Sequence, residues 1–150
     1  MKTLQTRPYM LTNEEGAVLH VLGVPITVKA SSEQTDGAFN LLEVRCPPAF
    51  ATPLLIHYRE DVAVYVLEGT LTFFWGSEKR VARAGSFLFQ PRGIPHGFRV
   101  EGHSASRILY MTMPAGFDRL VLEHRLSTPG PEREINAARY KIEILGPLPK

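Results

Sequence analysis

Residues 85–96 read Gly85-Ser86-Phe87-Leu88-Phe89-Gln90-Pro91-Arg92-Gly93-Ile94-Pro95-His96, and this stretch decides the fold. Its apolar part, Ser86–Phe89, has the composition of a strand. Pro91 and Pro95 lack the backbone N–H that a sheet ladder needs, so the residues between them are expected to form a loop. That loop delivers His96 to the start of the following strand.

A second informative stretch precedes it. It reads Pro53-Leu54-Leu55-Ile56-His57-Tyr58-Arg59-Glu60-Asp61-Val62, followed by Ala63-Val64-Tyr65-Val66-Leu67-Glu68-Gly69. Glu68-Gly69 is typical of a tight hairpin turn, because glycine takes a positive φ at no steric cost.

The predicted strand within this stretch, Val62–Leu67, is apolar on both faces. Side chains alternate with period two, so Val62, Val64 and Val66 share one face and Ala63, Tyr65 and Leu67 share the other. A barrel strand that faces water on its outside should alternate apolar with polar residues. The outer face is therefore expected to be covered by another strand, a tail or a second subunit, and a homodimer is the economical interpretation.

Short apolar runs separated by Gly/Pro turns extend over residues 17–113 and predict an all-β sandwich or barrel. After Pro114-Ala115-Gly116 the spacing of Phe117, Leu120, Val121 and His124 changes to that of a short helix, which Ser127–Pro131 stops. A second helix is predicted over Glu132–Arg139. The alternating tail, residues 140–149, packs on the barrel or on a partner. The predicted strands are Val18–Lys29, Phe39–Cys46, Val62–Leu67, Thr70–Trp75, Lys79–Arg83, Ser86–Phe89, Gly97–Val100 and Arg107–Met113.

Length and composition predict one globular domain over residues 1–150. The 44% hydrophobic content and the mean hydropathy of −0.07 suit such a domain. No apolar run is long enough for a membrane span, and no signal-type segment follows Met1, so a cytoplasmic protein without a membrane partner is expected. The net charge of +2 is carried by scattered residues, which argues against nucleic-acid binding. The single cysteine, Cys46, excludes an internal disulfide and is expected to be a buried hydrophobe.

The two quoted stretches resemble the two halves of the cupin motif. The first half of that motif is His-x-His, then Glu, then Gly seven residues later; the second is Gly-x5-Pro-x-Gly-x2-His. His57, Gly69 and the whole second half match, whereas Leu55 and Val62 stand where the other His and the Glu belong. The lead-in (Leu22–Ser31 and Gly37–Val44) and the exit Pro114–Phe117 are similar to those of single-domain bacterial cupins of the quercetin 2,3-dioxygenase-like group.

This resemblance implies a cupin barrel, also called a double-stranded β-helix or jelly roll, with short C-terminal helices. It also implies a metal site of three His and one Glu for Fe, Mn, Ni, Cu or Zn. Leu55 and Val62 have no lone pair to donate, so His57 and His96 are the remaining candidate ligands, and two imidazoles hold a divalent ion weakly. The sequence therefore favours no bound metal. The expected pocket residues are Leu55, Val62, Val64, Phe98 and Glu43.

Other polar residues have plainer interpretations. Glu43 either pairs with Arg45 or lines the cavity with it, and Glu60 and Asp61 are expected to be rim charges. Tyr58 and Arg59 are expected to face away or to stand at the mouth. His20, His103 and His124 lack ligand spacing to the pair and are expected to be surface or structural residues. The strand aromatics are expected to be mostly core or interface: Phe73, Phe74, Trp75, Phe87, Phe89 and Phe98.

Three functions remain open at this point, and the sequence does not decide whether the protein is an enzyme. The first is a binding module that holds a small apolar or aromatic molecule, oriented by His57 and His96. The second is a dioxygenase-like oxidoreductase that uses both histidines to hold a metal. The third is metal-free acid/base catalysis, such as isomerisation or lactone opening, with Glu43 or Tyr65 as the second polar group.

Overall fold

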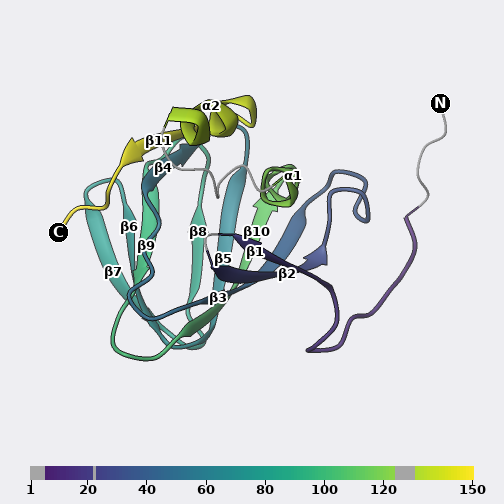
Figure 1. The fold of residues 1–150 in the computed structure, drawn as a ribbon, viewed down its shortest axis with the longest axis horizontal. Coiled ribbons are helices and arrows are strands. Elements are labelled where there is room, and N and C mark those ends of the chain that lie inside the picture. Colours follow the sequence, from purple (N-terminus) through teal and green to yellow (C-terminus); the bar gives the residue numbers. More distant parts are fainter. Residues whose placement is uncertain (1–5, 22, 124–130) are drawn as a thin grey trace.

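A computed structural model describes residues 6–21, 23–123 and 131–150, and it shows two antiparallel β-sheets (Figure 1). The all-β prediction is confirmed. The six-stranded sheet has the order β1 (Ala17–Val21), β2 (Val24–Ala30), β3 (Asn40–Cys46), β10 (Ser106–Met113), β5 (Asp61–Glu68) and β8 (Phe87–Gln90). The five-stranded sheet has the order β11 (Ile142–Gly146), β4 (Leu54–His57), β9 (His96–Val100), β6 (Thr70–Trp75) and β7 (Glu78–Arg83).

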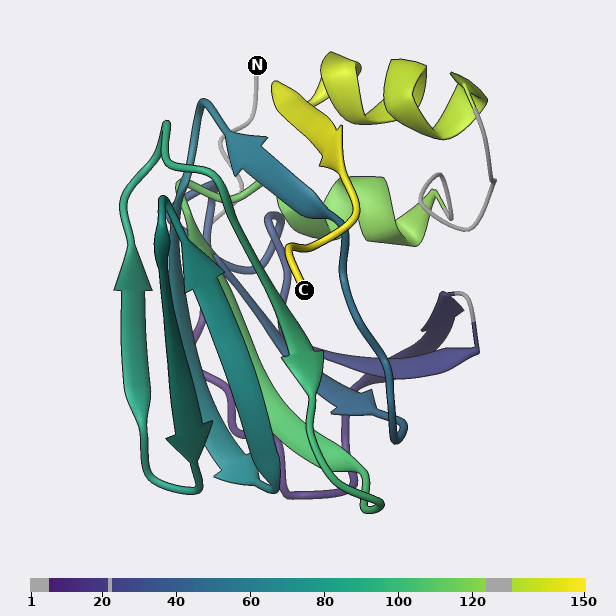
Figure 2. The same cartoon turned by 90° about the vertical axis from the view of Figure 1, so that its left-hand side faces the viewer.

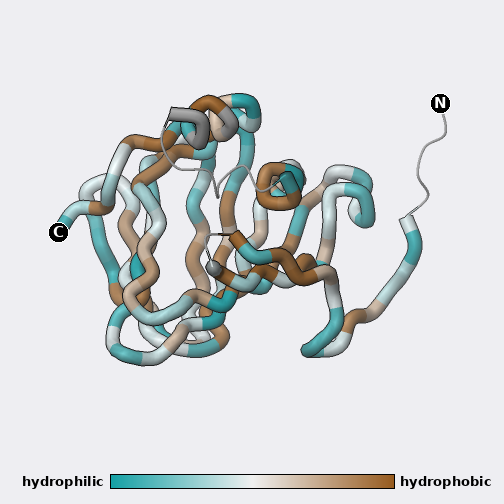
Figure 3. The backbone as a smooth tube through the Cα atoms, viewed as in Figure 1, coloured by the Kyte–Doolittle hydropathy of each residue, from teal (hydrophilic) through white to brown (hydrophobic). Residues whose placement is uncertain are grey.

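Both sheets contribute their inner faces to one apolar core. On β5, the prediction from strand parity is confirmed, because Val62, Val64 and Val66 are each at most 2% exposed. They belong to the same buried cluster as Leu71 and Phe73 of β6 in the opposite sheet. Figure 3 shows apolar residues recurring along the strands and in the first helix. The alternation of period two thus defines an inside and an outside for β2, β3 and β5.

The hairpin turn at Gly69 has the geometry that the sequence predicts. Its φ is +92°, and a Cβ at this position would lie 2.8 Å from the Cα of Ser106. Both the backbone angle and the close approach require glycine. The loop from Pro91 to Pro95 also forms as expected and leads directly into β9, which starts at His96.

Two strand predictions need correction. The run Val18–Lys29 is not one strand, because the chain turns at Gly23 and forms the hairpin of β1 and β2. The short strand β4 was missed because its four residues show no alternation of apolar with polar side chains. It pairs on one side with β11, formed by the alternating tail, and on the other with β9. The tail therefore packs on the barrel.

Two helices lie at one end of the sheets, α1 (Phe117–Leu122) and α2 (Pro131–Arg139), as Figure 2 shows. Leu120 of α1, Ala137 of α2 and Ile142 of β11 form a small buried cluster of their own. The predicted helical residue His124 and the helix stop up to Gly130 lie outside the described residues. No helix in the described part of the chain is long and apolar enough to cross a membrane.

Candidate functional site in the barrel

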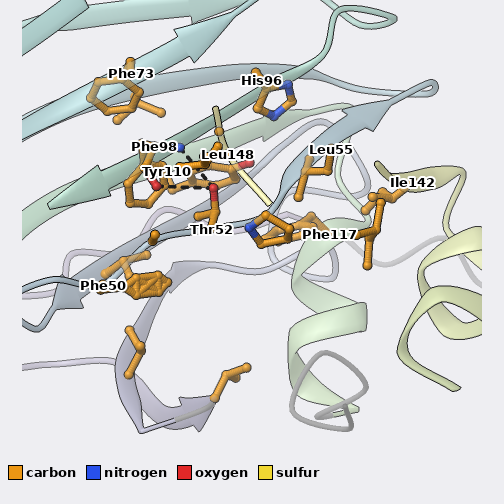
Figure 4. A pocket seen from close by; sticks show the side chains of 18 of the residues that line it. Phe50, Thr52, Leu55, Phe73, His96, Phe98, Tyr110, Phe117, Ile142 and Leu148 are labelled. Atoms are coloured by element: carbon orange, nitrogen blue, oxygen red, sulfur yellow. Dashed lines mark hydrogen bonds between the residues drawn. The ribbon is translucent and has the colours of Figure 1, made fainter. Parts of the chain in front are cut away.

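A cavity of about 440 Å³ opens between the two sheets. Its wall is mostly apolar and draws on both sheets, on α1 and on the C-terminal tail. Phe50, Phe73, Phe98 and Phe117 supply aromatic surface, and Leu148 of the tail also reaches the cavity (Figure 4). A volume of this size suits a small organic molecule, since ligand pockets typically span about 300–1,000 Å³.

Three of the five expected pocket residues line this cavity: Leu55, Val64 and Phe98. Val62 is fully buried in the core and is not part of the lining. Glu43 was misplaced by the prediction. It lies on the opposite face of β3 from the buried Leu42 and Val44, where its carboxylate accepts a hydrogen bond of 3.1 Å from Arg107 rather than from Arg45.

The structure brings the two predicted histidines together. Leu55 on β4 pairs with His96 on β9, so Leu55, His57 and His96 share the inner face of the five-stranded sheet. The rings of His57 and His96 are nearly parallel, with an angle of 12° and centroids 5.2 Å apart. Both side chains are buried, at 1% and 5% exposure.

Glu60 is a functional candidate that the sequence interpretation placed wrongly. It is not a rim charge, because only 1% of it is exposed. The bend at Tyr58 and Arg59 turns the chain so that Glu60 Oε1 lies 3.1 Å from His57 Nδ1. Asp61, the next residue, does stay near the rim, where Arg92 binds it and lowers the pKa of its carboxyl.

Tyr110 on β10 is the residue that sequence reasoning missed. Its hydroxyl lies 3.3 Å from His57 Nε2, so His57 has a partner on each ring nitrogen. Tyr110 lines the cavity, whereas Tyr65, the tyrosine suggested from sequence, lies on the outer face and is 42% exposed. Burial, and then the charge of Glu60, raise the pKa of the Tyr110 phenol, which keeps it protonated.

His96 presents a free lone pair to the site. Its Nδ1 lies 3.1 Å from the carbonyl oxygen of Ile94, and because a carbonyl only accepts, Nδ1 carries the proton. Nε2 is then an acceptor, and it is buried without a hydrogen-bond partner among the described residues. Burial, and then the neighbouring His57, lower the pKa of His96 to about 4. The ring is therefore neutral near pH 7.

A second unpartnered polar atom belongs to the same wall. Gln90 at the end of β8 lines the cavity, and its Nε2 is buried with no partner among the residues described. Gln90 pairs with Val62 on β5, while Tyr110 pairs with Val64 on the other side of that strand. The inner face of the sheet thus carries a donor amide and a phenol on either side of β5.

Helix α1 is anchored so that Phe117 packs beside the histidine. Asn40 Oδ1 accepts hydrogen bonds from Thr112 Oγ1 at 2.6 Å and from the backbone N–H of Gly116 at 3.2 Å. The Asp118 carboxylate accepts from the Ser32 backbone N–H at 2.7 Å. The Phe117 ring then meets the His57 ring edge to face, with centroids 5.4 Å apart, and helps to shield His57 from water.

The remaining predicted residues fall as follows. His20 and His103 are exposed, as expected, and His124 lies outside the described residues. Tyr58 is 52% exposed and faces away from the cavity, with its hydroxyl donating to Glu143 Oε1 at 2.6 Å. Cys46 is fully buried, and burial raises the pKa of its thiol to about 12, which fits a core residue rather than a nucleophile.

The comparison with known proteins agrees with this geometry. The family model described as a cupin domain matches residues 42–112, which contain both quoted motifs, from β3 to β10. The same fold recurs in KdgF from Halomonas sp., with a TM-score of 0.67 and 19% identity over 75% of this chain and 99% of that one. Residues 42–112 of this chain are a cupin domain. An RmlC-like cupin from Shewanella frigidimarina NCIMB 400 has a TM-score of 0.64 and 16% identity over 77% of this chain and 98% of that one.

One curated relative of this cupin is the quercetin 2,3-dioxygenase of Bacillus subtilis (strain 168). The two are 26% identical over 154 residues, which cover 93% of this chain and 45% of the relative. The cupin therefore spans less than half the length of that enzyme. The two solved structures described above, at 19% and 16% identity, establish a shared fold and nothing about activity.

The donor set of this cupin does not fit the metal cage that the superfamily implies. Leu55 and Val62 have no lone pair, and both ring nitrogens of His57 already have partners in Glu60 and Tyr110. His96 Nε2 is left as a single available imidazole donor in this part of the barrel. Across residues 6–21, 23–123 and 131–150, no group of three or more His, Cys, Asp or Glu side chains is placed to hold an ion.

Proposed function

We propose that this cupin binds a small, neutral, largely apolar molecule in its barrel without the help of a metal ion. The observation that carries the proposal is the buried Nε2 of His96, which has no hydrogen-bond partner among the described residues and lies in the wall of a largely apolar cavity. Buried polar atoms in folded proteins almost always have a hydrogen-bond partner. A buried polar atom without one in a cavity wall therefore suggests that a bound ligand supplies the partner.

The ligand chemistry follows from two buried atoms of cavity-lining residues that have no hydrogen-bond partner among the described residues. His96 Nε2 accepts, so it suits a ligand O–H or N–H, and Gln90 Nε2 donates, so it suits a ligand oxygen. Leaving a buried polar group unsatisfied costs about 1–3 kcal/mol. A ligand that supplies the missing partner should therefore bind more tightly than its hydrocarbon analogue. A charged ligand is disfavoured, because the aromatic wall offers no counter-ion.

Isothermal titration with a matched pair, 2-naphthol and naphthalene, tests this proposal. We expect 2-naphthol to bind about tenfold more tightly, which corresponds to about 1.4 kcal/mol. His96→Phe should remove that preference while naphthalene binding persists, and His20→Ala, a change of an exposed histidine, should alter neither. Equal affinities in the wild-type protein, or no binding of either compound, would refute the proposal.

A dioxygenase-like role is the second candidate, and the 26% identity to quercetin 2,3-dioxygenase over 93% of this chain favours it. It requires His57 to release Glu60 or Tyr110 so that a ring nitrogen can face a metal beside His96. Elemental mass spectrometry, together with oxygen consumption in the presence of quercetin, tests it. About one equivalent of metal per chain, lost in both His57→Ala and His96→Ala, would support this role over the metal-free one.

We further propose that the cupin is a homodimer through the outer face of the six-stranded sheet. This face carries an exposed apolar cluster, Tyr65, Phe87 and Phe89, at 42%, 66% and 51% exposure. Tyr65 pairs with Phe87 across β5 and β8, so the cluster is contiguous. No described strand or tail residue covers it, which leaves a second subunit as the cover proposed from the strand pattern.

A further inference from the structure

We propose that Glu60, His57 and Tyr110 form a proton relay that makes the cavity a metal-independent site for proton transfer at a carbon next to a ketone. This inference rests on the proposed binding function, because the ketone must occupy the cavity. It goes further in assigning an activity and a substrate class, neutral apolar ketones with an acidic C–H beside the carbonyl.

The three groups form one line from the protein interior to the cavity. Glu60 Oε1 is 3.1 Å from His57 Nδ1, and His57 Nε2 is 3.3 Å from the Tyr110 hydroxyl. Of the three, Tyr110 alone lines the cavity, while Glu60 and His57 are each 1% exposed. The carboxylate accepts the Nδ1 proton, so Nε2 keeps its lone pair and can accept from the phenol.

In this arrangement Tyr110 contacts the substrate, His57 is the base that accepts the proton of Tyr110, and the Glu60 carboxylate binds the other nitrogen of His57. In such chains the carboxylate fixes the imidazole tautomer and stabilises the imidazolium that forms when the ring takes a proton. The Phe117 ring packs against His57 and keeps the relay dry. The exchange of a proton between Tyr110 and His57 therefore takes place away from bulk water.

The proposed step balances without any other reactant. The C–H bond next to the carbonyl breaks and its proton goes to the Tyr110 oxygen, while the proton already on that oxygen passes to His57 Nε2. The C–H electron pair becomes the new C=C bond, and the carbonyl π pair moves onto oxygen. Glu60 offsets the charge of the imidazolium, and reversal of the step returns a proton to the same carbon or to another position of a conjugated enolate.

Gln90 is placed to assist at the oxygen. It is one of the cavity-lining groups with an unused N–H, and an amide donor aimed at a developing oxyanion is a general device for stabilising such a charge. Tyr110 and Gln90 flank β5 on its inner face. Their strands are two strand spacings apart, about 9.5 Å, and Gln90 is also offset by two residues, about 6.8 Å, because it pairs with Val62 whereas Tyr110 pairs with Val64. The two backbones are therefore about 12 Å apart, and a ligand must lie diagonally across β5 to meet both side chains.

The activity is tested with 2-tetralone, a neutral bicyclic aromatic ketone, in D2O that contains EDTA. Binding is followed by chemical-shift perturbation, and deuterium uptake at the carbon between ring and carbonyl is followed by proton NMR. We expect the protein to raise the uptake rate at least about a hundredfold above buffer, within the range of general acid–base catalysis. Tyr110→Phe should return uptake to the buffer rate while the ketone still binds.

Two further variants separate the relay from a general effect on the fold. Glu60→Gln should lower uptake at least tenfold, and Tyr65→Phe, a tyrosine on the outer face, should leave it unchanged. Uptake at the buffer rate by protein that binds 2-tetralone would overturn the relay and leave the binding function standing. If 2-tetralone fails to bind at all, the binding function falls and the relay falls with it.

A measurement on the wild-type protein alone tests the relay without depending on whether the variants fold. Nitrogen-15 histidine spectra report which ring nitrogen of His57 carries the proton. The relay requires a protonated Nδ1, with a proton resonance displaced downfield by the carboxylate, and an unprotonated Nε2. A neutral His57 with its proton on Nε2 would overturn the proposal.

Discussion

The burial of a neutral His96 predicts a defined acid sensitivity. Its pKa is lowered from 6.5 to about 4 in the folded protein, first by burial and then by His57. Between these two values the unfolded chain binds a proton at this residue and the folded chain does not. The contribution of His96 to stability is therefore fully present above pH 6.5 and is lost as the pH falls toward 4.

The magnitude follows from the interval between the two pKa values. Each pH unit over which the proton numbers differ by one changes the free energy of unfolding by about 1.4 kcal/mol. From 6.5 down to about 4, the loss reaches about 3 kcal/mol. That is a large part of the stability of a typical small domain, about 5–15 kcal/mol.

The assay is urea unfolding followed by circular dichroism, between pH 7 and pH 4, for the wild-type protein and for His96→Phe. The variant loses the hydrogen bond to Ile94 at every pH, so its curve is offset, but it has no imidazole to protonate at this position. As the pH falls from 7 to 4, we expect the free energy of unfolding of the wild-type protein to decrease by about 3 kcal/mol relative to that of His96→Phe. Both proteins are dialysed against EDTA first, so that metal binding does not contribute.

Parallel curves of unfolding free energy against pH for the two proteins would contradict this expectation. They would mean that His96 titrates at the same pH in the folded and unfolded states, and hence that it is not held as a buried neutral acceptor. The ligand preference for a donor, argued above from Nε2, would then lose its physical basis.

Three other changes test separate parts of the account. Gly69→Ala should lower the free energy of unfolding by about 2 kcal/mol or more, measured in urea, because of the positive φ and the contact with Ser106. Asp118→Asn should cost about 2 kcal/mol, since the buried carboxylate that anchors α1 loses acceptor capacity; unchanged stability would show that this anchor is dispensable. Phe87→Ser combined with Phe89→Ser should turn a dimer into a monomer by light scattering, and a wild-type monomer would contradict the proposed interface.

The motif spacing predicted the core of the site because it is local. The loop between Pro91 and Pro95 places His96 at the start of a strand. Strand parity likewise predicted the buried face of β5. These features depend on short-range geometry and on the alternation of side chains between the two faces of a strand. Both can be recognised in a sequence.

The rest of the site depends on geometry that spacing does not show. Glu60 reaches His57 because the two residues after β4 bend the chain, and a charged residue in a loop is otherwise expected at the rim. Tyr110 lies 53 residues after His57 and meets it only through sheet pairing. The sequence indicates Glu43 or Tyr65 as the second polar group for acid/base catalysis, beside the histidines. In the structure each of them faces outward on its strand, and Glu60 and Tyr110 contact His57 instead.

Metal-independent binding is tested most directly by a titration of 2-naphthol into protein stripped of metal with EDTA, repeated after addition of Fe²⁺ and Zn²⁺. We expect saturable binding at one site per chain, with the same affinity in both states. Binding that appears only after a metal is added, or no binding in either state, would contradict it.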